Sequence, residues 1–220
     1  MAKHLTKKQR EELTSKHSGK KPRRREGTKE LFYSFLIVCE GTRTEPEYFR
    51  HFTSRRSRVI TIGADRSTKK LVEETRKRRD LDTYDYVWVA FDKDDNADFN
   101  EAIEMADKAG FHCAWSNEAF ELWFCLHFIE LTTAVSRKQY IEILEREIRK
   151  FDPKFTYTKG GDQMFDVLSK YGNETSAKNR AQKLREQYVD KNYSQQNPST
   201  TVDLLVSILE EKRYSFARNR

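Results

Sequence analysis

Three acidic residues follow two apolar stretches of the chain, and their carboxylates could together hold a metal ion. Glu40 ends the run "SFLIVCE" and is followed by glycine, and Asp92 and Asp94 come directly after the run "YVWVAF". Carboxylates that lie close together repel one another unless a cation neutralises them. Oxygen ligands select Mg²⁺, with Mn²⁺ second. The chemistry expected of such a group is metal-assisted phosphoryl transfer or phosphodiester hydrolysis, although "DKDDN" alone would also make an ordinary turn.

The segments around these residues alternate between strand and helix patterns. Thr44, with Pro46 in the first turn and Glu47 three residues on, has the spacing of a capping box and is expected to cap a helix. Strands are expected over residues 31–39, 58–64, 84–92 and 111–115, and further helices over residues 67–82 and 99–108. This alternation predicts an α/β fold with a mostly parallel sheet covered by helices on both faces. Ligands bind beyond the carboxyl ends of such strands, so the acidic residues are expected on one rim.

The second half of the chain is expected to be helical, without further strands. Helices are predicted over residues 117–130, 136–151, 161–172, 174–189 and 199–213, the last capped by Ser199. Three parts are therefore expected: a basic, disordered tail over residues 1–30, an α/β core over residues 31–130, and a helical extension over residues 131–220 that packs on the core.

The net charge of +7 is concentrated at the N-terminus. Residues 1–30 contain eleven Lys and Arg and four Glu, and this balance equals that of the whole chain. Such a tail attracts phosphate backbones through counterion release, and we expect Arg23, Arg24 and Arg25 to contact nucleic acid. A solvated, solubilising arm is the alternative interpretation.

Composition excludes several other classes of protein. Aromatic residues make up 12% of the chain, which argues against global disorder, and no apolar stretch is long enough to span a membrane. The N-terminus lacks the apolar core of a signal peptide, so a cytoplasmic location is expected. The three cysteines are far apart, which indicates reduced thiols and disfavours a zinc site. The eight glycines form no P-loop motif.

Four further residues are candidates for the site or its surroundings. Glu121 lies in the apolar segment "AFELWFCLHF", where a buried carboxylate needs a partner; a place in the site and a salt bridge to an arginine both satisfy this need. His127 in the same segment is expected to be a hydrogen-bonded core residue. Arg43 and Lys93 are candidate phosphate contacts, and a structural ion pair of Arg43 with Glu40 or Asp92 is the alternative.

A strand ending in Glu-Gly, followed by a strand ending in D-x-D, resembles the Toprim fold. The blocks "IVCEGTRTEPEYF", "YDYVWVAFDKDDN", "SNEAFELWFCLHF" and "NPSTTVDLLVSIL" together resemble the RloB-like family, which is related to Toprim proteins. The resemblance implies a Mg²⁺-dependent nuclease that acts in bacterial phage defence, or abortive infection, with an AAA-type ATPase as partner. It also implies that Asp92 and Asp94 hold the metal and that Glu40 binds metal or transfers a proton.

Three functions remain open from the sequence. The first is a metal-dependent nuclease with a catalytic set of Glu40, Asp92, Asp94 and Glu121, which acts on DNA or RNA, tRNA included. The second is a latent or non-catalytic effector that works only with an ATPase partner. The third is a phosphatase-like or nucleotidyl-transfer enzyme with the same metal site. A homo-oligomer is compatible with each of them.

Overall fold

The computed structural model describes residues 32–214, which belong to a single compact unit. The expected basic tail, with Arg23, Arg24 and Arg25, lies outside the described residues. The strands are β1 (Tyr33–Cys39), β2 (Ser57–Gly63), β3 (Tyr86–Asp92), β4 (His112–Asn117) and β5 (Ser199–Thr200). The helices are α2 (Thr44–Arg50), α3 (Thr68–Arg79), α4 (Phe99–Lys108), α5 (Glu121–Leu126), α6 (Arg137–Ile148), α7 (Gly161–Tyr171), α8 (Glu174–Glu186) and α9 (Val202–Tyr214), with a short 3₁₀ helix, η1 (Tyr193–Gln195). None of the helices within residues 32–214 is long and apolar enough to cross a membrane.

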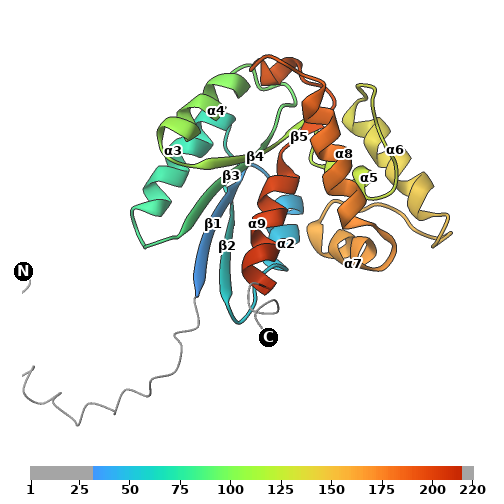
Figure 1. Ribbon diagram of the computed structural model, residues 1–220, viewed down its shortest axis with the longest axis horizontal. Helices are drawn as coiled ribbons and strands as arrows, with labels where there is room; N and C mark the ends of the chain where they lie inside the picture. Colours follow the sequence, from blue (N-terminus) through green and yellow to red (C-terminus); the bar gives the residue numbers. More distant parts are fainter. Residues whose placement is uncertain (1–31, 215–220) are drawn as a thin grey trace, which may run out of the picture. The chain divides into compact units, whose positions relative to one another are not determined.

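The strands form one five-stranded sheet in the order β2-β1-β3-β4-β5 (Figure 1). Strands β1 to β4 are parallel, and the short β5 is antiparallel to β4. The sheet is flanked by helices on both faces (Figure 1). The predicted α/β fold with a mostly parallel sheet is therefore confirmed.

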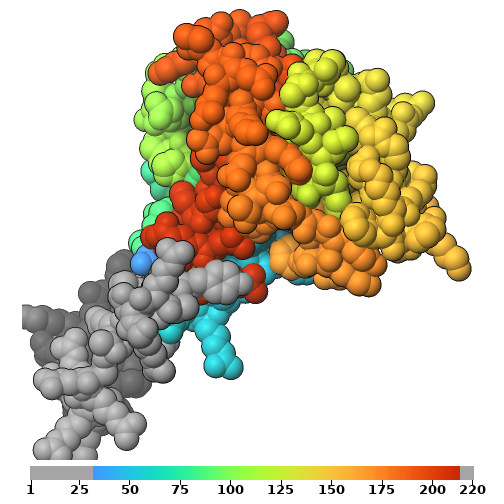
Figure 2. Space-filling model, turned by 45° about the vertical axis from the view of Figure 1, so that its right-hand side comes forward, coloured from blue at the N-terminus to red at the C-terminus, as the bar shows by residue number. Residues whose placement is uncertain are grey.

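Alternate residues of the interior strand β1 point into two separate hydrophobic cores. Phe35, Ile37 and Cys39 pack with residues of α2, α5 and the C-terminal helices, whereas Leu36 and Val38 pack with residues of α3 and α4. This alternation explains why β1 is apolar at every position from Phe35 to Cys39, because both of its faces are covered there. The space-filling view shows α7, α8 and α9 adjoining one another, with α6 beyond them (Figure 2).

Strand β5 was not predicted, and the expected start of the last helix at Ser199 is wrong. Ser199 and Thr200 pair with the end of β4, and helix α9 begins only at Val202. The Thr201 hydroxyl accepts a hydrogen bond from the main-chain N–H of Trp115 and donates one to the main-chain oxygen of Cys113, both at 2.9 Å. These contacts give hydrogen-bond partners to main-chain groups at the edge of β4. A helix that began at Ser199 would leave these groups unpaired.

The predicted capping box at Thr44 is also wrong, because a tertiary contact replaces it. Thr44 is the first helical residue of α2, and the residue before it makes no capping bond through its side chain. Glu47 instead accepts a hydrogen bond at 2.8 Å from the main-chain N–H of Gly161 at the start of α7. A Cβ atom at Gly161 would collide with the main-chain atoms of Thr44 and Tyr48, so glycine lets α7 approach α2 this closely.

Helix α5 is shorter than the predicted helix over residues 117–130. Strand β4 continues through Asn117, and α5 covers only residues 121–126. The hydrogen bonds of the strand determine where it ends: Ser116 and Asn117 pair with β5. The loop between β4 and α5 therefore reaches the same rim of the sheet as the ends of β1 and β3.

Candidate active site at the carboxyl edge of the sheet

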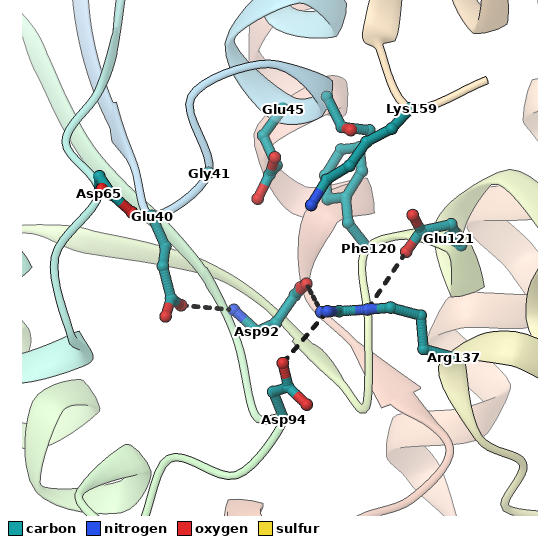
Figure 3. Close-up of a pocket in the computed structure, with 11 residues that line it drawn as sticks. Glu40, Gly41, Glu45, Asp65, Asp92, Asp94, Phe120, Glu121, Arg137 and Lys159 are labelled. Carbon is teal, nitrogen blue, oxygen red and sulfur yellow. Dashed lines mark hydrogen bonds and ion pairs between the residues drawn. The ribbon is translucent and has the colours of Figure 1, made fainter.

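A cavity of about 170 Å³ opens at the carboxyl ends of β1 and β3. Eight of the residues that line it carry a charge: Glu40, Glu45, Asp65, Asp92, Asp94, Glu121, Arg137 and Lys159. They come from the ends of three strands, from the first turns of α2, α5 and α6, and from the loop before α7. Figure 3 shows the side chains of Glu45, Asp92, Asp94, Glu121, Arg137 and Lys159 around one space, with Glu40 and Asp65 to one side of it. The fold thus gathers six carboxylates and two cationic groups in one place.

Glu40 is fixed at the end of β1 by hydrogen bonds to the neighbouring strand. Its main-chain N–H donates to the main-chain oxygen of Ala90 at 2.8 Å. Its carboxylate accepts a hydrogen bond from the Asn96 side-chain amide at 3.2 Å. It also accepts one from the Asp92 main-chain N–H at 3.3 Å (Figure 3). Burial raises the pKa of Glu40, and these two hydrogen bonds partly offset the effect. Glu40 is therefore held beside Asp92 rather than pointing to solvent.

Asp92 and Asp94 flank a tight turn at the end of β3. Asp94 has a positive φ of 34°, a conformation that Asp tolerates better than most residues. The turn is anchored on the end of β4 and the residue that follows it, because the Lys93 N–H donates to the Ser116 oxygen at 2.8 Å and the Asp94 N–H to the Glu118 oxygen at 3.1 Å. The Asp92 side chain is 14% exposed and that of Asp94 is 44% exposed. The turn thus presents one protected carboxylate and one open to solvent.

Arg137 connects three carboxylates from two segments, the turn at the end of β3 and the start of α5. Its Nη2 lies 2.9 Å from Oδ2 of Asp92, its Nη1 lies 3.1 Å from Oδ2 of Asp94, and its Nε lies 4.0 Å from Oε2 of Glu121 (Figure 3). Arg137 is the first residue of α6, whose start is fixed by a capping box between Ser136 and its third following residue, Gln139. The cap determines where the arginine enters the site.

Glu45 and Glu121 form the buried side of the cavity, each with 6% exposure. Burial, and then repulsion by Glu121 and Glu40, raises the pKa of Glu45. Glu121 accepts a hydrogen bond at 2.8 Å from the Tyr157 hydroxyl. A Cβ atom at Gly41 would collide with the carboxylate of Glu45, so the glycine after Glu40 leaves space for a second carboxylate. Glu121 thus lines the cavity and also lies 4.0 Å from an arginine, Arg137; its role as a metal or water ligand stays a prediction.

Lys159 is the second cationic group of the site and differs from Arg137 in its partners. It lies in the loop before α7, and its amine points into the space between Glu45, Asp92 and Arg137 (Figure 3). No ion pair involving Lys159 occurs within the part of the chain that the structure describes. Its ammonium group is therefore available to a ligand that enters the cavity.

The cavity offers carboxylate oxygens, which are the ligands that a hard divalent cation such as Mg²⁺ prefers. Six carboxylates face only two cationic side chains, and burial followed by repulsion from Glu45 and Glu121 raises the pKa of Asp92. This excess of negative charge is costly without a further cation. Among residues 32–214, no three side chains already form a coordination sphere. The carboxylates of Asp92 and Asp94 are held by Arg137 instead, so a metal ion would have to replace its guanidinium.

The family comparison agrees with the resemblance of the sequence. The model of the RloB-like protein family matches residues 35–209. The chain belongs to the RloB-like family. A search of curated proteins found no match to this RloB-like chain, and a search of solved structures found none either.

The structure of this RloB-like protein brings together the predicted catalytic set. Glu40, Asp92, Asp94 and Glu121 all line the same cavity. His127 is a buried core residue, with burial lowering its pKa to about 3, but neither ring nitrogen has a hydrogen-bond partner among the described residues.

The two predicted phosphate contacts lie outside the lining of the cavity. Arg43 is 65% exposed and pairs with Glu47, its Nε lying 3.8 Å from the carboxylate, rather than with Glu40 or Asp92 as the structural alternative expected. Lys93 points its amine at the main-chain oxygen of Asp94, 2.9 Å away. Their contact with nucleic acid stays a prediction.

Sequence reasoning missed four groups of this RloB-like site: Glu45, Asp65, Arg137 and Lys159. Glu45 had a usable signal, since it comes five residues after Glu40 and at the start of a helix expected on the same rim. Arg137 begins a helix with a clear capping signal, but nothing in the sequence indicates which cavity that helix end faces. Lys159 lies in a loop, and its position depends on the contact between α2 and α7.

Proposed function

We propose that this protein is a metal-dependent nuclease that hydrolyses phosphodiester bonds of nucleic acid in bacterial antiviral defence. The observation that carries the proposal is the convergence of Glu40, Asp92, Asp94 and Glu121 in one cavity at the carboxyl edge of a parallel sheet. Membership of the RloB-like family supports the proposal through the Toprim-like motif that the family resemblance brings with it.

Six residues that line the cavity have a role in this proposal. Asp92 and Asp94 hold Mg²⁺ or Mn²⁺, and Glu121 and Glu45 add negative charge behind them. The metal, when bound, supplies charge stabilisation for the attacked phosphate and lowers the pKa of a water nucleophile. Glu40, which is oriented by the hydrogen bond from Asn96, accepts the proton of that water. Lys159 faces the cavity and binds a nonbridging phosphate oxygen.

The test compares Asp92→Asn, Glu40→Gln and the wild type on labelled single- and double-stranded DNA and RNA with Mg²⁺ or Mn²⁺. We expect each substitution to lower the cleavage rate at least about 100-fold, because each removes a group that acts on the reacting atoms. Asp95→Asn is the matched control, since Asp95 is exposed and does not line the cavity. Equal cleavage rates in all four proteins contradict the proposal.

A second candidate is a latent effector that becomes active only with an ATPase partner. The ion pairs of Arg137 with Asp92 and Asp94 favour it, because they engage the proposed metal ligands in the isolated chain. On this alternative, the purified protein binds metal weakly and cleaves no substrate until the partner and ATP are added. A cleavage assay with and without the partner distinguishes the two candidates.

A further inference from the structure

The guanidinium of Arg137 occupies the place in which the site would hold a cation. Two of its nitrogens lie 2.9 Å and 3.1 Å from the carboxylates of Asp92 and Asp94, and its third lies 4.0 Å from Glu121. An arginine is always charged in a protein, so these contacts neutralise carboxylates that would otherwise repel one another. Arg137 thus acts as the internal counter-ion of these carboxylates in the structure.

The main chain of Arg137 is fixed, whereas its side chain has room to move. The capping box of α6 holds the helix start, and the Arg137 N–H donates to the Glu118 carboxylate at 3.4 Å. The side chain itself is 38% exposed, and its long stem ends in the cavity rather than in the core. Leaving Asp92 and Asp94 therefore requires only rotation about side-chain bonds, without movement of the helix.

We propose that Arg137 competes with the divalent cation for Asp92 and Asp94, and that its guanidinium, once released, binds the phosphate of the substrate. The inference rests on the proposed function of the site. A guanidinium that is paired with carboxylates has few donors left for a phosphate, but a free one offers two parallel N–H groups that match phosphate oxygens. Lys159, which is unpaired among the described residues, lies across the same cavity and completes a cationic pair for the phosphate.

The exchange makes metal binding and phosphate binding depend on each other. Without metal, Arg137 stays on the carboxylates, and the cavity is too acidic to attract a phosphate. With metal bound, Arg137 leaves Asp92 and Asp94, and its guanidinium binds the substrate phosphate instead. By linkage, each ligand raises the affinity for the other, typically by about 5- to 150-fold in coupled sites. The device would prevent nucleic acid from occupying a site that cannot cleave it.

The test measures Mn²⁺ affinity by isothermal titration calorimetry for the wild type, Arg137→Met and Arg137→Lys. Met removes the competing charge and keeps the length of the side chain. We expect Mn²⁺ to bind Arg137→Met about tenfold more tightly than the wild type, with Arg137→Lys in between. The control is Arg146→Met, also on α6, because Arg146 is 60% exposed and pairs with Glu147 outside the cavity.

Two further measurements separate competition from a purely structural role. The rise in melting temperature on adding Mn²⁺ should be larger in Arg137→Met than in the wild type, since metal then restores a missing counter-ion. Binding of a single-stranded oligonucleotide in Ca²⁺, measured by fluorescence anisotropy, should weaken about tenfold in the same variant. A structural role predicts lower stability without tighter metal binding.

The outcomes distinguish this inference from the proposed function. If the wild type binds Mn²⁺, Asp92→Asn abolishes that binding, and Arg137→Met binds it no more tightly than the wild type, then only the competition is wrong. If the wild type and Arg137→Met both fail to bind Mn²⁺, the metal site and the competition are both wrong. If Arg137→Met does not fold without Mn²⁺ and folds with it, the counter-ion role is supported, and Arg137→Lys then provides the affinity comparison.

Discussion

The side-chain amide of Asn96 donates hydrogen bonds both to the carboxylate of Glu40 and to the main-chain oxygen of Asp92, each at 3.2 Å. One side chain thereby joins the end of β1 to the turn after β3. Removing a group that orients a catalytic carboxylate commonly lowers the activity, even though that group does not touch the substrate. Asn96 is therefore a positioning residue of the proposed site.

We expect Asn96→Ala to lower the nuclease rate by about 10- to 100-fold while leaving the fold intact. The control is Asn100→Ala, because the Asn100 side chain bonds to Asn192 and Ser194 away from the cavity. Cleavage rates and circular dichroism spectra of both variants make the comparison. Equal activity of Asn96→Ala and the wild type would show that Glu40 needs no orienting partner.

Tyr157 supplies the hydrogen bond that Glu121 receives on the buried side of the site. Replacing Tyr157 with Phe removes this donor from a carboxylate that is 6% exposed. We expect a loss of about 1 to 2 kcal/mol in the free energy of unfolding, measured by urea denaturation. Tyr84→Phe is the control, since no hydrogen bond to the Tyr84 hydroxyl is found among residues 32–214. The same loss in both variants would contradict this account.

Gly161 permits the close contact of α7 with α2 that also positions the loop carrying Lys159. A Cβ atom at this position would meet the main-chain atoms of Thr44 and Tyr48, which cannot rotate away. We expect Gly161→Ala to lower the free energy of unfolding by about 3 kcal/mol. Gly110→Ala, with φ at +74° and nothing within 4 Å of its Cβ, should cost only about 1 kcal/mol. Thermal or urea unfolding of both variants tests the difference.

Glu174 makes stability depend on pH at a place away from the acidic cavity. Its pKa is raised to about 7, first by burial and then by a hydrogen bond to Glu210, against the opposing effect of Lys178. The pKa of Glu210 is lowered in turn: burial opposes the shift, but the hydrogen bonds with Glu174 and Lys178, and then the charges of Lys178 and Arg213, outweigh it. His127 and Glu174 both line a second cavity, separate from the acidic one. Burial lowers the pKa of His127 to about 3, so its ring stays neutral at the pH values at which Glu174 titrates.

In the unfolded chain, Glu174 ionises near its ordinary pKa of 4.5. Stability contributed by the protonated folded form is therefore complete below pH 4.5 and is lost as the pH rises towards 7. We expect Glu174→Gln to match the wild type at pH 4.5 and to exceed it at pH 8 by about 1 kcal/mol, since solvent screens this partly exposed group. Urea denaturation at both pH values measures the difference, with Glu211→Gln on the exposed side of α9 as control. A difference that is independent of pH would contradict the prediction.

The sequence by itself determined strands β1 to β4 and the acidic residues that follow β1 and β3. The run from Phe35 to Cys39 is apolar at every position because β1 is covered on both faces, and the run before Asp92 is apolar for the same reason. Parallel strands place their carboxyl ends on one edge, so the meeting of Glu40 and Asp92 followed from the pattern alone. Glu121 was predicted as well, since a carboxylate in an apolar helix requires a partner.

Only the tertiary structure decided which groups complete the site. Arg137 is 45 residues from Asp92 in the sequence, and its contact with it depends on how α6 packs after a loop that has no strong local pattern. The hydrogen bonds of Thr201 to β4 and of Glu47 to Gly161 likewise replaced the local caps that the sequence predicted. The spacing of residues in the sequence predicts hydrogen bonds between residues that lie within one helical turn of each other. Contacts between distant segments depend on the packing of whole helices. The ion pairs of Arg137 with Asp92 and Asp94 are contacts of this kind.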